Sequence, residues 1–327
     1  MATTVYVIDD VQAKDIKKES IRDGFGRGLL EAGKQNDQIV AICADLTDST
    51  KISLFAEAFP DRFIECGIAE ANMIAIGAGL ASAGKIPFAA SFSVFALNKG
   101  FEQLRVTAAY PNVNLKVVGT HSGISIGEDG PSQMSVEDLS LACSLPGFTV
   151  ISPADETSMI ELVKLAAAHV GPVFIRAGRP KVARVYEAGR QFKIGESVEL
   201  LAGSDVTLIA TGLLVAESIR AAETLEAEGI SARVIDFHTV KPLDREAIAR
   251  AARETGAIVV SEEHLADGGL GVRIAQVVAE THPAPMEFVG IQNTYAESAT
   301  PEQLLDKYGL LARDVAAAAR RVVKRKR

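Results

Sequence analysis

Short apolar runs alternate with helix-length segments almost to the end of this chain. Six strand-like runs come first, with helical segments between most of them: Ile39–Ala44, Arg62–Cys66, Phe88–Phe92, Leu115–Thr120, Thr149–Ser152 and Val173–Ile175. This alternation is typical of α/β folds in which helices cover mostly parallel sheets. The pattern therefore predicts a doubly wound unit in the first part of the chain.

A second unit follows a break at Arg179-Pro180 and a polar, irregular stretch. Its predicted strands are Val206–Ala210, Ala232–Asp236, Ala257–Ser261 and Met286–Gly290. Its predicted helices are Val215–Glu228, Asp244–Thr255, Gly271–Thr281 and a closing helix near Ala312–Val323. With 327 residues, the chain is long enough for two domains. We expect two doubly wound, mostly parallel α/β domains, at residues 15–182 and 199–327, joined by a linker at 183–198.

The charge balance argues against nucleic acid as a partner. The chain has 34 basic and 42 acidic residues, a net charge of −8, and its basic residues cluster only at Lys324–Arg327. No apolar run reaches the roughly 18 residues of a membrane helix, and the N-terminus lacks the pattern of a signal peptide. We therefore expect a cytoplasmic protein that contacts neither membrane nor nucleic acid.

Common ligand-binding motifs are missing. The sequence has no P-loop and no dinucleotide fingerprint, and we interpret the glycine cluster at Asp267–Gly271 as a turn that leads into a helix. The three cysteines, Cys43, Cys66 and Cys143, lie in apolar contexts without metal-ligand spacing. We expect reduced core thiols and no metal site in this chain.

The segment from Cys66 to Gly84 predicts a helix that is apolar or small nearly all round, and such a helix is buried. Glu70 lies near its start, with no Lys or Arg within one turn. A buried carboxylate without a partner is costly, so it must be hydrogen-bonded or protonated. Two interpretations stay open: backbone amides at the helix start satisfy Glu70, or its carboxyl group shares a proton with a ligand.

Further along, two stretches are candidates for a ligand site. Phe92 and Phe95 lie three residues apart at a strand-to-helix junction, where their rings could form one face. A long glycine-rich stretch, Gly119–Gln133, directly follows a predicted buried strand. In α/β sheets, ligands bind at the carboxyl ends of strands, and loops of this length are often functional.

Several of these motifs resemble the C-terminal half of transketolase, in the same order and with similar spacing. They are Gly67-Ile-Ala-Glu70, Ser91-Phe92 with Phe95, Thr120-His121 with Gly127-Glu-Asp129-Gly-Pro131, Phe174-Ile-Arg176 and Asp205–Gly212. The match runs from about Lys17 to near the end. It implies a pyrimidine-binding domain followed by a transketolase C-terminal domain, and an enzyme that uses thiamine diphosphate and Mg²⁺.

The resemblance also implies roles for the cofactor-binding residues. Glu70 matches the catalytic glutamate that hydrogen-bonds the aminopyrimidine ring and promotes its imino tautomer. Phe92 and Phe95 match the aromatic residues that pack against that ring. At the third aromatic position of some transketolases this chain has Asn98.

Six further residues match positions that bind the sugar substrate. Four of them fall where the family binds the phosphate group: Arg22, Ser49, His121 and Arg176. Asp129 matches a contact to sugar hydroxyls. Gln133 replaces a histidine of the family, and an amide can hydrogen-bond a substrate but cannot carry a proton near neutral pH. The run Ser261–His264 also resembles the family, and we interpret it as structural or interfacial.

A whole transketolase also holds the diphosphate and metal through a Gly-Asp-Gly motif, which is missing from this sequence. We therefore expect the C-terminal subunit of a split transketolase that moves a two-carbon ketol unit from a ketose phosphate to an aldose. A separate N-terminal subunit would hold the diphosphate and Mg²⁺, in a heterotetramer with two copies of each chain. Two alternatives stay open: the beta subunit of a 2-oxoacid dehydrogenase-type enzyme, and a non-catalytic regulatory subunit.

Overall fold

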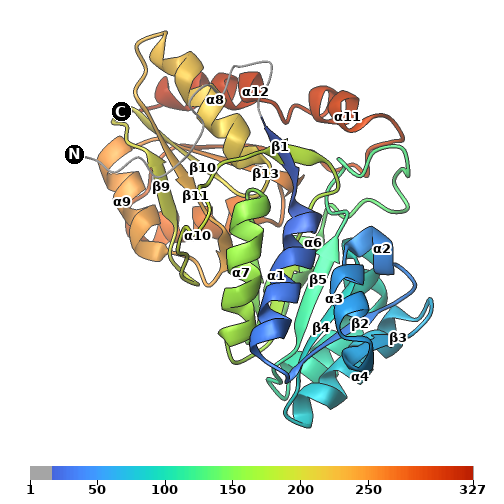
Figure 1. The fold of residues 1–327 in the computed structure, drawn as a ribbon. Coiled ribbons are helices and arrows are strands. Elements are labelled where there is room, and N and C mark those ends of the chain that lie inside the picture. Colours follow the sequence, from blue (N-terminus) through green and yellow to red (C-terminus); the bar gives the residue numbers. More distant parts are fainter. Residues whose placement is uncertain (1–16, 327) are drawn as a thin grey trace.

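The computed structural model describes residues 17–326, which form two α/β units side by side (Figure 1). Within these residues, seven strands make up the first sheet, in the order β12-β6-β7-β5-β4-β2-β3. Six of these strands run parallel: β2 (Ile39–Cys43), β3 (Phe63–Glu65), β4 (Ile86–Phe92), β5 (Lys116–Thr120), β6 (Thr149–Ile151) and β7 (Val173–Arg176). The predicted strands of the first unit are therefore present, with ends shifted by one or two residues.

Side chains alternate between the two faces of this sheet, as the pleat requires. Ala41 and Cys43 of β2 belong to the core beneath α1 (Ile21–Gln35), α3 (Ser53–Ala58) and α7 (Glu156–Ala168). Ile42 between them belongs to the core on the opposite face. That face is covered by α4 (Glu70–Ser82), η2 (Phe95–Lys99), α5 (Phe101–Gln103), η3 (Leu104–Ala109) and α6 (Asp138–Ser144). Two short helices, α2 (Thr47–Thr50) and η1 (Pro60–Arg62), complete the edge near β3.

The second sheet in the described part of the chain has five strands, in the order β14-β13-β10-β11-β9. Four of them are parallel: β10 (Val206–Ala210), β11 (Ala232–Asp236), β13 (Ile258–Leu265) and β14 (Met286–Ile291). The fifth, β9 (Val198–Leu201), runs antiparallel to β11. The helices of this unit are α8 (Leu214–Glu226), α9 (Arg245–Thr255), α10 (Leu270–Thr281), α11 (Pro301–Lys307) and α12 (Ala312–Val323). The expected fold of two mostly parallel α/β domains is therefore present.

One strand crosses between the units. β12 (Thr239–Lys241) follows β11 in the chain but pairs antiparallel with β6, so it extends the first sheet. The sequence did not predict this strand, because three residues are too short to show a period of two. A second ribbon joins β1 (Lys18–Ser20) to β8 (Lys181–Ala183) and brings the start of α1 beside Pro180. Residues 15 and 16 of the first predicted domain lie outside the described residues.

The predicted linker is irregular between residues 184 and 197, but it is anchored to both units. The amides of Val185 and Tyr186 donate to Oδ2 of Asp155, at 2.7 and 2.8 Å. The fully buried Tyr186 donates its hydroxyl to Oδ2 of Asp236 at 2.6 Å, and Phe192 packs edge-on against its ring. The segment is therefore part of the core rather than a loose connection.

Two expectations about burial need correction. Along α4, Met73 and Gly77 are buried, whereas Ala75 and Gly79 on the opposite side are exposed, so the helix is not enclosed by this chain. Cys66, just before it, is half-buried, unlike the other two cysteines. Small and apolar side chains give this helix no polar face, so composition alone could not show which side the chain leaves uncovered.

Among residues 17–326, no helix is long and apolar enough to cross a membrane.

Candidate active site

The candidate site lies at the carboxyl edge of the first sheet. Strand register places Phe92, the last residue of β4, opposite Thr120, the last residue of β5. It also places Gly119 opposite Arg176, the last residue of β7. The residues that follow these strands therefore meet at one edge, where ligands bind in parallel α/β sheets.

Glu70 is the first residue of α4, and only 4 % of its side chain is exposed. Its ion-pair partner is Lys99, whose Nζ lies 3.2 Å from Oε2 and 3.4 Å from Oε1. Lys99 comes from η2, so the partner is distant in sequence and not within the helix of Glu70. Sequence reasoning missed Lys99, although its position four residues after Phe95 in a predicted helix would have placed both on one face.

A row of rings continues from this ion pair. Nζ of Lys99 lies 4.7 Å from the centroid of Phe95, and Phe95 stacks on Phe92 with the centroids 5.7 Å apart. On Phe92, the ring of His121 stacks at 3.8 Å. The two phenylalanines therefore form the joint face that the sequence suggested, and it connects Glu70 to His121 through direct contacts.

His121 is a neutral hydrogen-bonding group at physiological pH. Burial, helped by the nearby charges of Arg22 and Arg179, lowers its pKa to about 3. Nε2 lies 3.3 Å from Nη1 of Arg22, and because a guanidinium only donates, Nε2 accepts. Nδ1 therefore carries the proton and donates to Oγ1 of Thr120, 2.9 Å away. In this state the ring cannot donate a proton through Nε2.

Arg22 stands in the first turn of α1, held by the ribbon of β1 and β8. Its Nη1 donates to the carbonyl of Ser49 at 2.7 Å, and its Nη2 donates to the carbonyl of Arg179 at 3.2 Å. Its Nε is buried without a hydrogen-bond partner. An unpaired cationic donor beside His121 makes this cluster a candidate anion site.

Arg179 belongs to the same cluster, and the sequence analysis did not single it out. Its guanidinium contacts the carbonyl of Ile126 and lies 3.4 Å from Glu128 and 3.9 Å from Asp129. Asp129 therefore joins the cluster as well. Gln133 is half-buried in the same loop, where its backbone N–H donates to the carbonyl of Gly130 at 3.1 Å.

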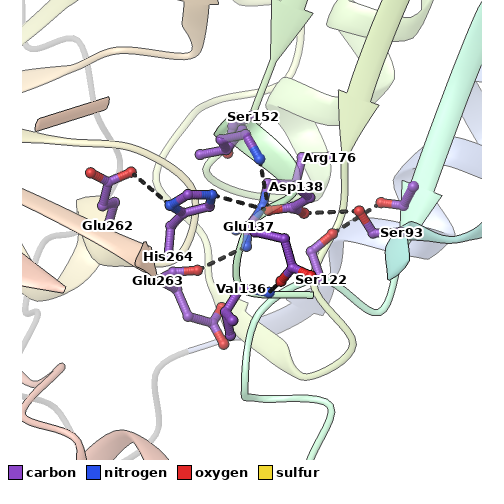
Figure 2. A network of polar contacts seen from close by, with 12 residues as sticks. Ser93, Ser122, Val136, Glu137, Asp138, Ser152, Arg176, Glu262, Glu263 and His264 are labelled. Carbon is purple, nitrogen blue, oxygen red and sulfur yellow. Dashed lines mark hydrogen bonds and ion pairs between the residues drawn. The ribbon is translucent and has the colours of Figure 1, made fainter. Parts of the chain in front are cut away.

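Arg176 does not join this cluster, so its predicted phosphate contact is not supported by its position. The side chain is 6 % exposed and lies at the boundary with the second unit (Figure 2). Its Nε donates to Oδ2 of Asp138 at 2.8 Å, and its Nη2 donates to the carbonyl of Glu263 at 2.8 Å. A buried carboxylate already neutralises this guanidinium, which leaves Arg179 as the accessible arginine of the Phe174–Pro180 segment.

Two other features have a structural explanation. Asn98 donates from Nδ2 to Oε1 of Glu137 at 2.9 Å. Glu262 accepts the amides of Leu270 and Gly271 at the start of α10, at 2.7 and 2.8 Å. The glycine cluster before α10 is therefore a turn into a helix, and the anion at the helix start is a side chain of the protein itself.

Comparison with known proteins agrees with this geometry. Residues 17–184 match the family described as transketolase, pyrimidine binding domain. Residues 195–315 match transketolase, C-terminal domain. The chain belongs to the transketolase family. Its two units correspond to the domains that the motifs of Glu70 and His121 implied.

Its relatives among curated transketolases include separate subunits. The 6-deoxy-6-sulfo-D-fructose transketolase subunit SqwH of Clostridium sp. (strain MSTE9) is 40 % identical over 317 residues, covering 96 % of this chain and 98 % of the relative. A subunit of the apulose-4-phosphate transketolase of Phocaeicola vulgatus is 36 % identical, and the match covers 93 % of this chain and 97 % of that subunit. The transketolase of Homo sapiens is 37 % identical over 94 % of this chain, which spans 49 % of that protein.

Solved structures of transketolases share the fold. A structure titled "Split gene transketolase, inactive beta4 tetramer" matches with a TM-score of 0.89 and 45 % identity, covering 94 % of this chain and 100 % of that one. The transketolase from Leishmania mexicana, at 23 % identity, has a TM-score of 0.80 over 97 % of this chain and supports the fold alone. These relatives do not favour the 2-oxoacid dehydrogenase alternative.

Transketolases depend on thiamine diphosphate, and the residues of this chain fit one end of that cofactor. The buried Glu70 carboxylate lies beside the stacked rings of Phe92 and Phe95, which suits a flat aminopyrimidine with a polar edge. Among residues 17–326, no group of three His, Cys, Asp or Glu side chains is arranged to bind a metal ion.

Proposed function

We propose that this chain is the pyrimidine-binding, C-terminal subunit of a split transketolase that works in the cytoplasm. It would move a two-carbon ketol unit from a ketose phosphate to an aldose acceptor. The observation that carries the proposal is the continuous row of contacts from Glu70, through Phe95 and Phe92, to the cationic cluster at His121. Such a row offers a ring site at one end and an anion site at the other.

At the first end, Glu70 would hold the aminopyrimidine of thiamine diphosphate through a proton shared with a ring nitrogen. The bound cofactor supplies the electron sink for carbon–carbon cleavage. Phe92 and Phe95 would orient the ring and exclude water. Lys99 must give up part of its contact with Glu70 when the ring enters.

At the other end, Arg22 and Arg179 would bind the phosphate of the sugar, with Ser49 and His121 beside it. Two guanidinium groups provide the charge-assisted hydrogen bonds that suit a phosphate. Arg179 takes the role that the sequence assigned to Arg176, because Arg176 already pairs with a buried carboxylate. Asp129 and Gln133, from the same loop, would contact the sugar hydroxyls.

The diphosphate and Mg²⁺ would be held by a separate N-terminal subunit, in a heterotetramer of two copies of each chain. Two observations support a partner. Curated relatives of almost the same length are named as subunits. In addition, Ile68, two residues before the start of α4, is 76 % exposed, and Ala75 and Gly79 are exposed on α4. An apolar surface beside the cofactor site is what an obligate interface requires.

The test is to titrate thiamine diphosphate and Mg²⁺ into this chain alone, and into its mixture with the N-terminal subunit. Near-ultraviolet circular dichroism and a ketol-transfer assay are the readouts. We expect the signal and the turnover only in the mixture, and near-complete loss of turnover, with assembly kept, for Glu70→Gln.

The remaining alternatives predict other results. Turnover of a 2-oxoacid with a lipoyl acceptor would favour the dehydrogenase subunit. Full turnover by Glu70→Gln, or cofactor-independent regulation of the partner, would favour a regulatory subunit.

A further inference from the structure

The second domain reaches the candidate active site through the end of β13. Figure 2 shows Glu262, Glu263 and His264 of that strand beside Asp138 and Arg176 of the first domain. All five residues are buried, with at most 6 % of their surface exposed. The proposed function assigns no task to this cluster.

Glu263 contacts the loop that carries His121. Its Oε1 accepts the amide of Ser125 at 2.6 Å. Gly123 lies so close that a Cβ there would be 2.2 Å from the carboxyl carbon of Glu263, and its φ of +79° also favours glycine. The loop from His121 to Gly127 is buried. A carboxylate of the second domain therefore fixes a loop of the first.

The backbone of Glu263 makes a second connection. Its carbonyl accepts Nη2 of Arg176 at 2.8 Å, and Arg176 donates its Nε to Asp138, also at 2.8 Å. The same oxygen of Asp138 accepts the hydroxyl of Ser93 at 2.8 Å. Ser93 directly follows Phe92, the ring on which His121 stacks. Both connections therefore end at the stacked rings of His121 and Phe92. The first reaches His121 through the loop, and the second reaches Phe92 through Ser93, directly after β4.

We propose that Glu263 is a positioning residue for substrate binding. It holds the loop of residues 121–127, and through the loop it sets the place of the His121 ring between Phe92 and Arg22. The second domain thus positions part of the cationic cluster at His121 without contacting the substrate. The effect on phosphate binding rests on the proposed function, whereas the position of His121 does not.

The first measurement is the NMR spectrum of this chain with labelled histidine side chains. The chain has five histidines, and His121→Gln identifies the signal of interest. Stacking on Phe92 at 3.8 Å gives the His121 ring a distinct chemical shift. We expect Glu263→Ala to move this signal, and Glu263→Gln to leave it nearly in place, because an amide oxygen can still accept from Ser125.

Two further variants distinguish a local effect on the loop from a general loss of structure. Glu262→Ala removes the neighbouring buried carboxylate, which holds the start of α10 and does not hydrogen-bond the loop. It should move the signal of His264 but not that of His121. Gly123→Ala adds a Cβ that would clash with the Glu263 carboxyl group, so it pushes the loop away from Glu263. It should therefore move the His121 signal although Glu263 is intact.

The second measurement uses the assembled enzyme with glyceraldehyde 3-phosphate and glyceraldehyde as acceptors. For Glu263→Ala we expect KM for the phosphorylated acceptor to rise about tenfold, with kcat changed about twofold or less. A tenfold change corresponds to weakening one charge-assisted hydrogen bond between the cationic cluster and the phosphate. KM for glyceraldehyde should change little.

An unmoved His121 signal in Glu263→Ala would overturn the proposal, and so would an equal rise of KM for both acceptors. If no assembled wild-type enzyme turns over, the proposed function fails, and the His121 signal alone then decides whether Glu263 positions the loop.

Discussion

Two arginines three residues apart, Arg176 and Arg179, have different surroundings. Arg176 is paired with the buried Asp138, whereas about a third of the Arg179 side chain is exposed, next to Asp129. A guanidinium that already has a buried carboxylate contributes to stability, and one that is partly exposed is available to a ligand.

We therefore expect opposite effects from replacing them. Arg176→Gln should lower the free energy of unfolding by about 3 kcal/mol, because it leaves the Asp138 carboxylate buried and unpaired. Arg179→Gln should change stability little and raise KM for phosphorylated substrates more than for unphosphorylated ones. Denaturant unfolding and steady-state kinetics of the assembled enzyme measure both. The reverse pattern would restore Arg176 as the phosphate ligand.

Lys99 is the ion-pair partner of the buried Glu70. Lys99→Met should lower the free energy of unfolding of this chain by about 1–2 kcal/mol, since a buried carboxylate loses its cation, while the half-exposed lysine limits the size of the effect. In a Glu70→Gln background the same change should cost less than half as much. Additive effects in this double-mutant cycle would show that the two groups do not interact.

The segment between the domains shows how an element with no regular structure can be held in place. Asp236, which accepts the hydroxyl of Tyr186, is fully buried, and burial raises its pKa to about 8. Asp155, beneath the same segment, also has a raised pKa because of burial. At neutral pH the folded chain therefore binds a proton at Asp236 that the unfolded chain releases.

This difference predicts a pH dependence of stability. Between about pH 4 and pH 8 the folded state holds more protons than the unfolded state, so the free energy of unfolding falls as the pH rises, by at most about 1.4 kcal/mol per pH unit for this group. Asp236→Asn should make the curve flatter and should stabilise the chain relative to wild type at pH 8. Asp61→Asn, which changes an exposed carboxylate, is the control. Equal slopes for all three proteins would contradict the assignment.

At the scale of the whole molecule, an uncovered apolar surface lies on one side of α4 and at Ile68, just before that helix. Ile68 is 76 % exposed beside the candidate cofactor site, whereas Val170, at 83 %, precedes β7 at the opposite edge of the sheet. Ile68→Glu should weaken assembly with the N-terminal subunit by about tenfold or more, because an interface core does not tolerate an unpaired charge. Val170→Glu should have no effect.

Sedimentation velocity of the mixed subunits measures both variants. Full assembly of Ile68→Glu would place the interface elsewhere, and loss of assembly in Val170→Glu would show that a charge on any face disrupts it.

Much of this fold follows from patterns that are local in the chain. Apolar runs such as Ile39–Ala44 and Val206–Ala210 identify strands because burial on both faces demands continuous hydrophobic residues. The motifs around Glu70, Phe92 and His121 identify the family, since their residue types and spacing are properties of the sequence. Three of the predicted site residues, His121, Asp129 and Gln133, come from the loop that follows the parallel strand β5.

Other features depend on residues far apart in the chain, and only the tertiary structure decided them. Lys99 reaches Glu70, and Arg179 rather than Arg176 lies near His121. In addition, β12 joins the sheet of the other domain, and Glu263 accepts a hydrogen bond from the loop of His121. Each of these depends on which side chains the packing of two domains leaves paired, buried or exposed. A hydrogen bond or ion pair forms through space and leaves no periodicity in the sequence, so local patterns alone cannot specify it.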